Sequence, residues 1–397
     1  MMKNKPTQNP IDLDAFCTDK LAQLESNHSR RYLVPTARQA EALAQRGAAK
    51  QSVLSFSCND YLGLSHHPEV IEAAQQAAQE FGVGAGASRL ITGNHPLFMQ
   101  LETLLAEIKQ TEDCLVFGSG YLANIGIIPA FIGTKDLLLV DELAHACINA
   151  GGQLSGAKII RFQHNNMQDL AHCLETHRQH YEKCLIVTDG VFSMDGDLAP
   201  LADMRQLADQ HHAWLMSDDA HGIGVVGHGM GSAHAFEPPV QIELQMGTLS
   251  KAVGGYGGYV CASHAVCEFL RNRARSLVFS TGLPPMSVAA AIAALKIIQR
   301  NPELCATPTQ LAALFCEKLD LPAPQSPIVP VIFKTNAATL AASEALLEAG
   351  FLVSAIRPPT VPENTARLRV AFNATHKKED ILSLADHIQK LQNELMP

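Results

Sequence analysis

Short apolar runs separated by longer mixed segments recur through the middle of the chain. The runs are rich in Leu, Ile and Val, and they cover 114–117, 137–140, 158–161, 185–188 and 214–217. Their length suits buried strands, and the segments between them are long enough for helices. Continuous apolar strands that alternate with helices are typical of a parallel sheet covered on both faces. The pattern therefore predicts an α/β fold with a mostly parallel central sheet.

The beginning of the chain has a mixed pattern. Residues 11–50 have the spacing of an amphipathic helix with a basic break at Arg30-Arg31, followed by a polar link. Residues 53–58 alternate with a period of two, which predicts a strand. Helices are predicted over 68–80 and 95–109, where apolar positions recur at helical spacing.

The pattern changes again from about residue 290. An Ala-rich helix leads to a Pro-rich linker over 322–330, and two more helices are predicted over 337–349 and 378–395, with strands between the linker and the last helix. We therefore predict three parts. They are a helical arm and strand over 1–58, a large ligand-binding domain over 59–290 and a smaller α+β domain over 291–397.

Composition narrows the class of protein. A hydrophobic share of 47% with 17% charged residues is typical of a globular chain with a large core, and a formal net charge of −9 argues against a nucleic-acid-binding surface. The ten cysteines are scattered without a Cys-x-x-Cys pair, and the first ten residues lack the apolar core of a secretion signal. The longest apolar run, 125–133, is too short to span a membrane. We expect a cytoplasmic protein with free thiols.

A lysine surrounded by small residues is the most informative candidate for chemistry. Lys251 has no charged neighbour between Leu244 and Cys261, and glycines follow it at 254, 255, 257 and 258. A lysine in apolar surroundings loses its proton more easily and becomes nucleophilic. The stretch therefore favours a lysine that forms a Schiff base, although a lysine beside a glycine-rich turn has the same pattern.

A glycine turn after the predicted strand 114–117 favours phosphate binding. Gly118-Ser119-Gly120-Tyr121 leads into a helix from about Leu122, and strand, turn and helix together direct free backbone N–H groups at an anion. The same residues match G-x-G-x-x-A, and Asp141 follows at the distance typical of a dinucleotide site. A nicotinamide or flavin site is therefore an alternative, although such a fingerprint usually begins its domain.

A second acidic cluster, Asp218-Asp219-Ala220-His221-Gly222, directly follows the predicted strand 214–217. A carboxylate at the end of a buried strand needs a cationic partner, a helix cap or a metal ion. Pyridoxal phosphate requires a carboxylate that keeps its pyridine nitrogen protonated and a lysine that forms an imine. Asp218 and Lys251 would meet these needs, and His221 would lie near the ring hydroxyl.

Further candidates follow from the same interpretation. Ser119, Gly120, Tyr121 and Thr248, with Ser280-Thr281, are candidate phosphate ligands, and His145 is a candidate to stack on the ring. Arg369 shares one face of an alternating strand with Arg367, so either could bind a substrate carboxylate. Polar side chains that end three predicted strands should converge on one rim of the sheet: Asp141 and His145, Asp189 and Ser193, Asp218 and His221.

Four motifs, in order and spacing, resemble the α-oxoamine synthases, which are fold-type I pyridoxal-phosphate enzymes that join an amino acid to an acyl thioester with loss of carbon dioxide. The motifs are Asn59-Asp60-Tyr61-Leu62-Gly63, Thr188-Asp189-Gly190-Val191-Phe192-Ser193-Met194-Asp195-Gly196, Asp218-Asp219-Ala220-His221-Gly222 and Gly247-Thr248-Leu249-Ser250-Lys251. The resemblance extends from about Asn59 to His376. It implies a fold-type I architecture with pyridoxal 5'-phosphate as cofactor, in a homodimer with shared active sites.

The resemblance also implies roles for individual residues. Lys251 would carry the cofactor, Asp218 would pair with the ring nitrogen, His221 with the ring oxygen, and His145 would stack on the ring. These four would be the catalytic residues. Further cofactor contacts would come from Ser119, Gly120, Tyr121, Ser193 and Thr248, and from Ser280 and Thr281 across the dimer interface. The substrates would meet His145, Arg369, Thr360, Asn59, Ser88 and one of Arg30 and Arg31.

Within the family, the segment Ala355-Ile356-Arg357-Pro358-Pro359-Thr360-Val361-Pro362 is similar to the branch that serves biotin biosynthesis. That similarity implies L-alanine and a pimeloyl thioester, carried by CoA or by acyl carrier protein, as substrates. Alternatives are a member of the family that uses glycine and a non-catalytic scaffold subunit. The presence of Lys251, Asp218 and His221 together argues against the scaffold.

Overall fold

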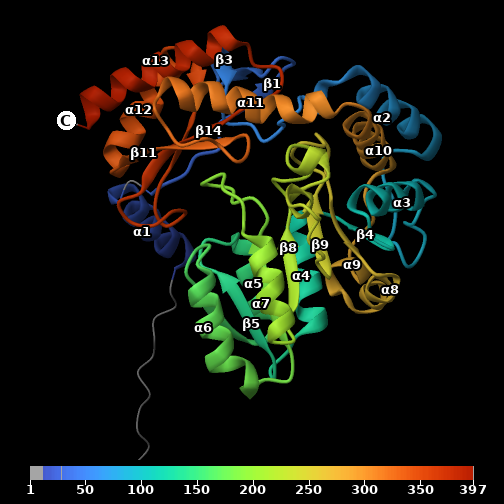
Figure 1. Cartoon of the computed structure of the whole chain (residues 1–397). Helices are drawn as coiled ribbons and strands as arrows, with labels where there is room; N and C mark the ends of the chain where they lie inside the picture. Colours follow the sequence, from blue (N-terminus) through green and yellow to red (C-terminus); the bar gives the residue numbers. More distant parts are fainter. Residues whose placement is uncertain (1–11, 28, 397) are drawn as a thin grey trace, which may run out of the picture.

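The central element of the computed structural model is a seven-stranded sheet, and the structure describes residues 12–27 and 29–396 (Figure 1). Its strand order is β4-β10-β9-β8-β7-β5-β6. The strands β9, β8, β7, β5 and β6 are parallel, whereas β10 runs antiparallel to both β4 and β9. The prediction of a mostly parallel central sheet is therefore confirmed. The bounds are β4 (Asp113–Phe117), β5 (Leu137–Asp141), β6 (Lys158–Phe162), β7 (Cys184–Asp189), β8 (Trp214–Asp218), β9 (Leu244–Thr248) and β10 (Gly258–Ala262).

Helices cover both faces of this sheet because successive side chains of each strand point to opposite faces. In β5, Leu138 and Val140 pack in one cluster with α4, α5 and α8, whereas Leu137 and Leu139 pack in another with α6 and α7. The helices are α4 (Gly120–Phe131), α5 (Ala146–Ser155), α6 (Met167–His177), α7 (Leu201–Gln210), α8 (His264–Arg273) and the short α9 (Arg275–Val278).

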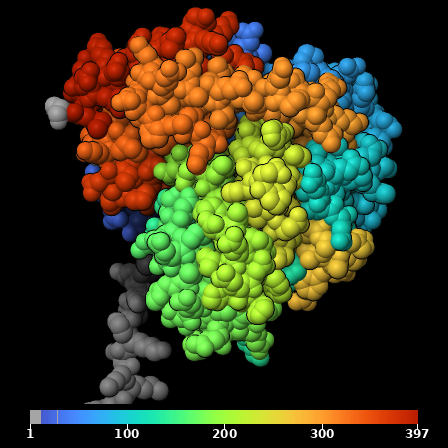
Figure 2. Space-filling model, in the orientation of Figure 1, coloured from blue at the N-terminus to red at the C-terminus, as the bar shows by residue number. Residues whose placement is uncertain are grey.

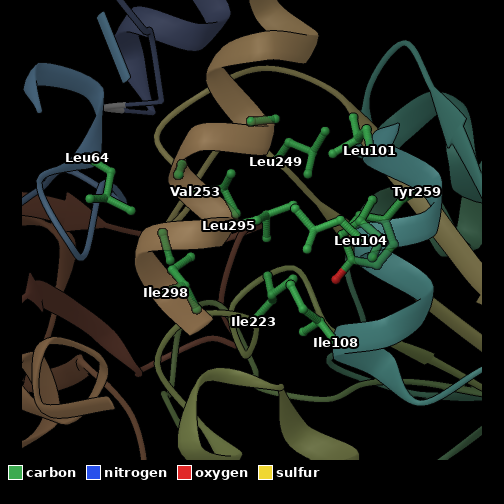
Figure 3. Packing of buried hydrophobic residues seen from close by; sticks show 14 of the residues in the cluster. Leu64, Leu101, Leu104, Ile108, Ile223, Leu249, Val253, Tyr259, Leu295 and Ile298 are labelled. Atoms are coloured by element: carbon green, nitrogen blue, oxygen red, sulfur yellow. The ribbon is translucent and has the colours of Figure 1, made fainter. Parts of the chain in front are cut away.

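A third cluster joins the sheet to helices that flank its β4 edge. In Figure 3, Leu101, Leu104 and Ile108 of α3 (Leu97–Lys109) face Leu295 and Ile298 of α10 (Pro285–Arg300). Leu249 and Val253, on either side of Lys251, lie in the same cluster. The segment that carries the lysine is thus anchored by buried apolar neighbours. The helix α2 (Pro68–Phe81) packs beside α10.

Two smaller sheets lie with the C-terminal helices, apart from the green segments of the large sheet in Figures 1 and 2. One has the order β1-β2-β3-β12 and the other β11-β14-β13. Their shared core holds Phe56 together with Val331, Leu368 and Ile381. The bounds are β1 (Thr36–Arg38), β2 (Leu43–Arg46), β3 (Gln51–Ser55), β11 (Ile328–Lys334), β12 (Phe351–Leu352), β13 (Ser354–Ile356), β14 (Ala366–Ala371), α11 (Pro302–Lys318), α12 (Asn336–Glu348) and α13 (Lys378–Leu395).

The prediction of a helix over residues 11–50 is wrong beyond Ser26. The helix α1 ends at Ser26 (Leu13–Ser26), and β1 and β2 form a hairpin whose second strand pairs with β3. Pairing with a strand that is itself held by the distant β12 overrides the weak helical spacing of residues 36–46. Within the described residues, no helix is both long and apolar enough to cross a membrane.

Candidate active site

A pocket of about 210 Å³ opens where the strands of the large sheet end. Its walls come from the ends of β7, β8 and β9 and from the starts of α4 and α5, so the rim expected from the sequence is the rim that holds the pocket. The lining residues are Ser119, Gly120, Tyr121, His145, Cys147, Asp189, Asp218, Ala220, His221, Met246, Thr248, Ser250 and Lys251.

Lys251 lies in the same pocket as the carboxylates of Asp218 and Asp189, which end β8 and β7. Burial lowers the pKa of its amine to about 8, although Asp218 and Asp189 act in the opposite direction. Half of the amine groups are therefore neutral near pH 8, whereas an ordinary lysine reaches this point more than two pH units higher. A neutral amine is the form that attacks an aldehyde.

Asp218 ends β8 and is buried. Its Oδ2 accepts a hydrogen bond of 2.8 Å from Asn124 Nδ2, and its Oδ1 accepts one of 3.1 Å from the backbone N–H of Ala220. Within the described residues no ion pair involves this carboxylate, so a cationic partner is expected from a ligand. The protonated nitrogen of a pyridine ring fits that requirement.

The next residue, Asp219, already has a cation. Lys109 Nζ lies 2.6 Å from Asp219 Oδ2 and also donates to the carbonyl of Met230 at 2.7 Å. Asp219 Oδ1 accepts from the backbone N–H of Ser232 at 2.9 Å. This buried pair fixes the chain directly behind Asp218 and His221.

His145 caps α5 and is held by Asp189. The backbone N–H of His145 donates to Asp189 Oδ1 at 3.1 Å, and its ring accepts from the N–H of Cys147. Burial lowers the pKa of His145, so the ring is neutral at pH 7. Burial, reinforced by the neighbouring Asp218, raises the pKa of Asp189 well above its usual value. A neutral imidazole at the pocket wall can stack on a flat ring.

The glycine turn and Thr248 line one part of the pocket. Ser119 caps α4, which starts at Gly120, so N–H groups of the first helical turn are free to meet an anion. A side chain at Gly120 would come within 3.2 Å of Met246 and 3.4 Å of Thr248, so only glycine leaves this space open. Thr248 Oγ1 lies 2.9 Å from Ser250 Oγ. The residues present therefore fit a phosphate-bearing ring.

Arg369 and Arg367 are both buried, and both contact the loop after β7. Arg369 Nε donates to the carbonyl of Ser193, and Arg367 forms an ion pair with Asp195. Arg367 is thus neutralised by a carboxylate, whereas the hydrogen-bond partners of Arg369 among the described residues are neutral. Of the two, Arg369 is the arginine with charge left for a substrate carboxylate.

The two N-terminal arginines have different partners. Arg30 Nη1 forms an ion pair with Glu25 at 3.1 Å, whereas Arg31 Nη2 donates to Thr360 Oγ1 at 3.3 Å. The structure therefore brings Arg31 and Thr360 together, which the sequence named separately.

Nine of the predicted residues do not line the lysine pocket of this chain: Arg30, Arg31, Asn59, Ser88, Ser193, Ser280, Thr281, Thr360 and Arg369. Ser88 and Thr281 form an isolated bridge between two extended segments. Ser280 and Thr281 line a separate small pocket with Arg89 and Gly118.

Tyr61 and Asn124 contact the site without having been singled out in the sequence, and Asp189 was expected only as a polar residue at the rim of the sheet. Tyr61 Oη lies 2.6 Å from His221 Nδ1, accepts from Arg369 Nη2 at 3.3 Å and lies 3.3 Å from Asn59 Oδ1. Asn124 holds Asp218, and Asp189 holds His145. Tyr61 stands inside a quoted motif, but nothing in the spacing of Asn124 distinguishes it from other residues of a buried helix.

The acidic residue that a dinucleotide site would need, Asp141, has other partners. Asp141 is buried and bonds to His164 Nδ1 and to the backbone N–H groups of Leu143 and Asn165. It does not line the pocket. In the described part of the chain, no group of three or more His, Cys, Asp or Glu residues could hold a metal ion.

Comparison with known proteins shows the family of the chain. The aminotransferase class I and II family profile matches residues 51–388. A relative from Acidiphilium cryptum, provisionally named 8-amino-7-oxononanoate synthase, is 60% identical over 94% of this chain and 96% of its own. The 8-amino-7-oxononanoate synthase of Maricaulis maris is 55% identical over 97% and 98%.

A solved structure adds the cofactor. A serine palmitoyltransferase variant from S. paucimobilis with a bound PLP–myriocin aldimine is 28% identical, with a TM-score of 0.90 over 97% of this chain and 99% of that one. The cofactor of this protein is pyridoxal 5'-phosphate. The chain belongs to the aminotransferase class I and II family and, within that fold-type I family, to the group of the 8-amino-7-oxononanoate synthases.

Proposed function

We propose that the chain joins L-alanine to a pimeloyl thioester with loss of carbon dioxide, and that Lys251, Asp218, His221 and His145 are its catalytic residues. The observation that carries the proposal is one pocket that holds a lysine with a pKa of about 8 and a buried carboxylate, Asp218, that forms no ion pair with the residues the structure describes. The thioester is carried by CoA or by acyl carrier protein. The identity to named synthases over nearly the whole chain supports the choice of reaction.

Each residue has a task in this reaction. When bound, the cofactor supplies an electron-accepting pyridine ring that stabilises negative charge at the α-carbon of the amino acid. Asp218 keeps a proton on the ring nitrogen, His221 meets the ring oxygen, and His145 covers the ring face. Ser119, Gly120, Tyr121 and Thr248 bind the phosphate. Ser193 lies on the loop that Arg369 fixes beside them.

The substrate side depends on arginine and lysine. Arg369 binds the carboxylate of alanine and so orients the α-carbon. Lys251, with its lowered pKa, accepts the proton from that carbon at near-neutral pH. Tyr61 connects Asn59 to Arg369 through hydrogen bonds. We assign Arg31 and Thr360, which are hydrogen-bonded to each other, to the acyl chain.

We also propose a homodimer with shared sites. A hollow of about 770 Å³ has apolar walls from Ile125, Pro129, Leu154, Val278 and Phe279, with Asn272, Arg273, Arg275 and Ser276 beside them, and Phe279 is 73% exposed. Ser280 and Thr281 directly follow that surface and are absent from the lysine pocket of their own chain. A second copy on this surface would take Ser280, Thr281 and Ser88 toward the pocket of its neighbour.

The test is product identity. The purified protein is incubated with pimeloyl-CoA, or the matching acyl carrier protein thioester, and with alanine, glycine or serine, and the products are identified by mass spectrometry. We expect the alanine product to dominate. Faster turnover with glycine or serine would assign the chain to another branch of the family.

The position of the covalent bond is tested separately. Borohydride reduction of the yellow protein followed by peptide mapping should place the label on Lys251, and Lys251→Ala should remove it. A label elsewhere, or a protein that binds no pyridoxal phosphate, would contradict the proposed site and favour a non-catalytic subunit.

A further inference from the structure

Tyr61 is a buried tyrosine that links the two halves of the proposed site. Its ring has no exposed surface, and its hydroxyl contacts both His221 and Arg369. His221 belongs to the loop after β8, and Arg369 belongs to β14 of a different sheet. One oxygen atom therefore lies between the residue expected at the cofactor ring and the residue expected at the substrate carboxylate.

Counting protons limits how these groups can be arranged. Arg369 can only donate, so Tyr61 Oη accepts from it. Burial, with Lys251 and Arg369 nearby, holds the pKa of His221 well below its usual value, so its ring carries one proton. Burial also raises the pKa of Tyr61, so the hydroxyl keeps its own proton. That proton goes either to His221 Nδ1 at 2.6 Å or to Asn59 Oδ1 at 3.3 Å.

The short contact decides between the two acceptors. A separation of 2.6 Å is typical of a strong hydrogen bond from a hydroxyl, whereas 3.3 Å is long for one. Donation by a cationic guanidinium to the same oxygen makes the hydroxyl a better donor. The hydroxyl proton therefore points at His221 Nδ1, and the ring proton of His221 lies on Nε2.

We propose that Tyr61 is a positioning residue that fixes the proton of His221 on Nε2 and thereby presents an N–H donor to the oxygen of the bound ring. His221 lines the pocket, and with Nδ1 engaged by Tyr61 the nitrogen left for a ligand is Nε2. Asp218 then offers an acceptor to the ring nitrogen, and His221 offers a donor to the ring oxygen. The same hydroxyl accepts from Arg369 Nη2. The residue expected at the cofactor ring and the residue expected at the substrate carboxylate therefore both depend on Tyr61. The inference rests on the proposed function in placing the ring in this pocket.

The variant Tyr61→Phe removes only the hydroxyl. Without the Nε2–H donor, the ring oxygen keeps more negative charge and holds the proton on the Lys251 nitrogen more firmly. The pH midpoint of the visible absorption change of the cofactor-loaded protein should therefore rise by about one unit, the size of one lost hydrogen bond. The dissociation constant of L-alanine, measured by the same absorbance, should rise about fivefold because Arg369 loses an acceptor.

The matched control is Tyr259→Phe. Tyr259 is equally buried, but its hydroxyl has no hydrogen-bond partner among the described residues. Its loss should leave both the midpoint and the alanine constant unchanged. Thermal unfolding of each cofactor-free variant shows whether the fold is intact.

Two further measurements test whether Tyr61 acts through His221. In a His221→Asn background, Tyr61→Phe should cause no additional shift of the midpoint, since it acts through the imidazole. ¹⁵N spectra of histidine-labelled protein, with His221 identified by its loss in His221→Asn, should show an Nε2–H ring. An Nδ1–H ring, an unchanged midpoint in Tyr61→Phe or additive shifts in the double variant would overturn the role of Tyr61. In each of these cases borohydride would still label Lys251. An incorrect role for Tyr61 is therefore distinguishable from an incorrect proposed function, which would also remove that label.

Discussion

At the scale of single residues, the site concentrates groups that are costly to bury. Lys251 is partly enclosed and deprotonates near pH 8, and burial, reinforced by repulsion from Asp218, raises the pKa of Asp189. A chain that folded for stability alone would not place these groups together. The cost is offset when a ligand supplies a cation to Asp218 and takes up the amine of Lys251.

Lys251→Met should therefore stabilise the cofactor-free protein. The unfolded lysine has an ordinary pKa, whereas the pKa of the folded one is about 8, so the cost of burying this lysine is complete below about pH 8 and is lost as pH rises toward the ordinary value. The gain should be about 2–3 kcal/mol at pH 7 and should shrink toward pH 10, where the folded lysine is neutral and the unfolded one has begun to lose its proton. Urea unfolding at the two pH values measures it.

Lys135→Met is the control, because Lys135 pairs with Glu182 on the surface, with 76% of its side chain exposed. Its effect should stay within about 0.5 kcal/mol. A Lys251→Met variant no more stable than the parent, or a gain that does not change with pH, would contradict the burial argument.

Much of the site could be predicted because its chemistry demands particular residue types near strand ends. Lys251, Asp218 and His221 stand in short motifs, and the structure brings them around one pocket. Asn124 could not be predicted in the same way. It lies on an apolar helix, and only the packing of α4 beside β8 shows that its amide reaches Asp218. Which of Arg30 and Arg31 reaches Thr360 also depends on a contact 329 residues away.

At the scale of elements, His164 joins three segments at the rim of the sheet. Its Nδ1 lies 3.1 Å from Asp141 Oδ1 at the end of β5, and its Nε2 lies 2.8 Å from Asp197 Oδ2 in the loop after β7. Burial lowers its pKa, but the hydrogen bonds to Asp141 and Asp197 outweigh that effect and raise the pKa to about 10. The loop that carries Ser193 is thus fixed to the sheet by a cation between two carboxylates.

His164→Gln should lower the free energy of unfolding by about 1–3 kcal/mol at pH 6, since two carboxylates lose their shared cation. The stabilisation by a histidine with a raised pKa is complete below pH 6.5 and is lost as pH rises through 10. The difference between His164→Gln and the parent should therefore be smaller at pH 10. Urea unfolding at both pH values tests this.

His172→Gln, at an exposed position of α6, should show little effect at either pH. A difference for His164→Gln that persists unchanged to pH 10 would mean that the imidazole acts as a neutral hydrogen-bond partner only.

Five strands of the large sheet, β4 to β8, were predictable because each contains a continuous apolar run, whereas β9 and β10 were not predicted. The strands within 36–46 were not predicted either, since they exist through pairing with β3 rather than through their own apolar pattern. The antiparallel direction of β10 in this mostly parallel sheet was not predictable either. A strand sequence buried on both faces does not reveal its direction.

At the scale of the whole molecule, the proposed homodimer makes a prediction about mixed assemblies. Lys251→Ala alone and the double change Ser280→Ala with Thr281→Ala alone should both be nearly inactive. When the two proteins are unfolded together and refolded, about a quarter of the sites in a random mixture should combine an intact lysine with an intact Ser280 and Thr281. Activity should return toward a quarter of the parental value.

Separate refolding of each variant followed by mixing is the control, because preformed dimers exchange slowly. Absence of recovery, together with a monomer mass by light scattering, would show that each pocket is complete within one chain.

The pairing of β3 with β12 has a consequence for how the chain is made. Ser57 donates to the carbonyl of Leu352, which lies 295 residues later, and β3 is parallel to the strand that contains Leu352. At 5–20 residues per second, the ribosome needs about 15–60 s to add that partner. During this interval β3 and Phe56 have left the exit tunnel without the core they belong to. We therefore expect β3 to need protection by a chaperone during synthesis, because its sheet can be completed only after Leu352 has been made.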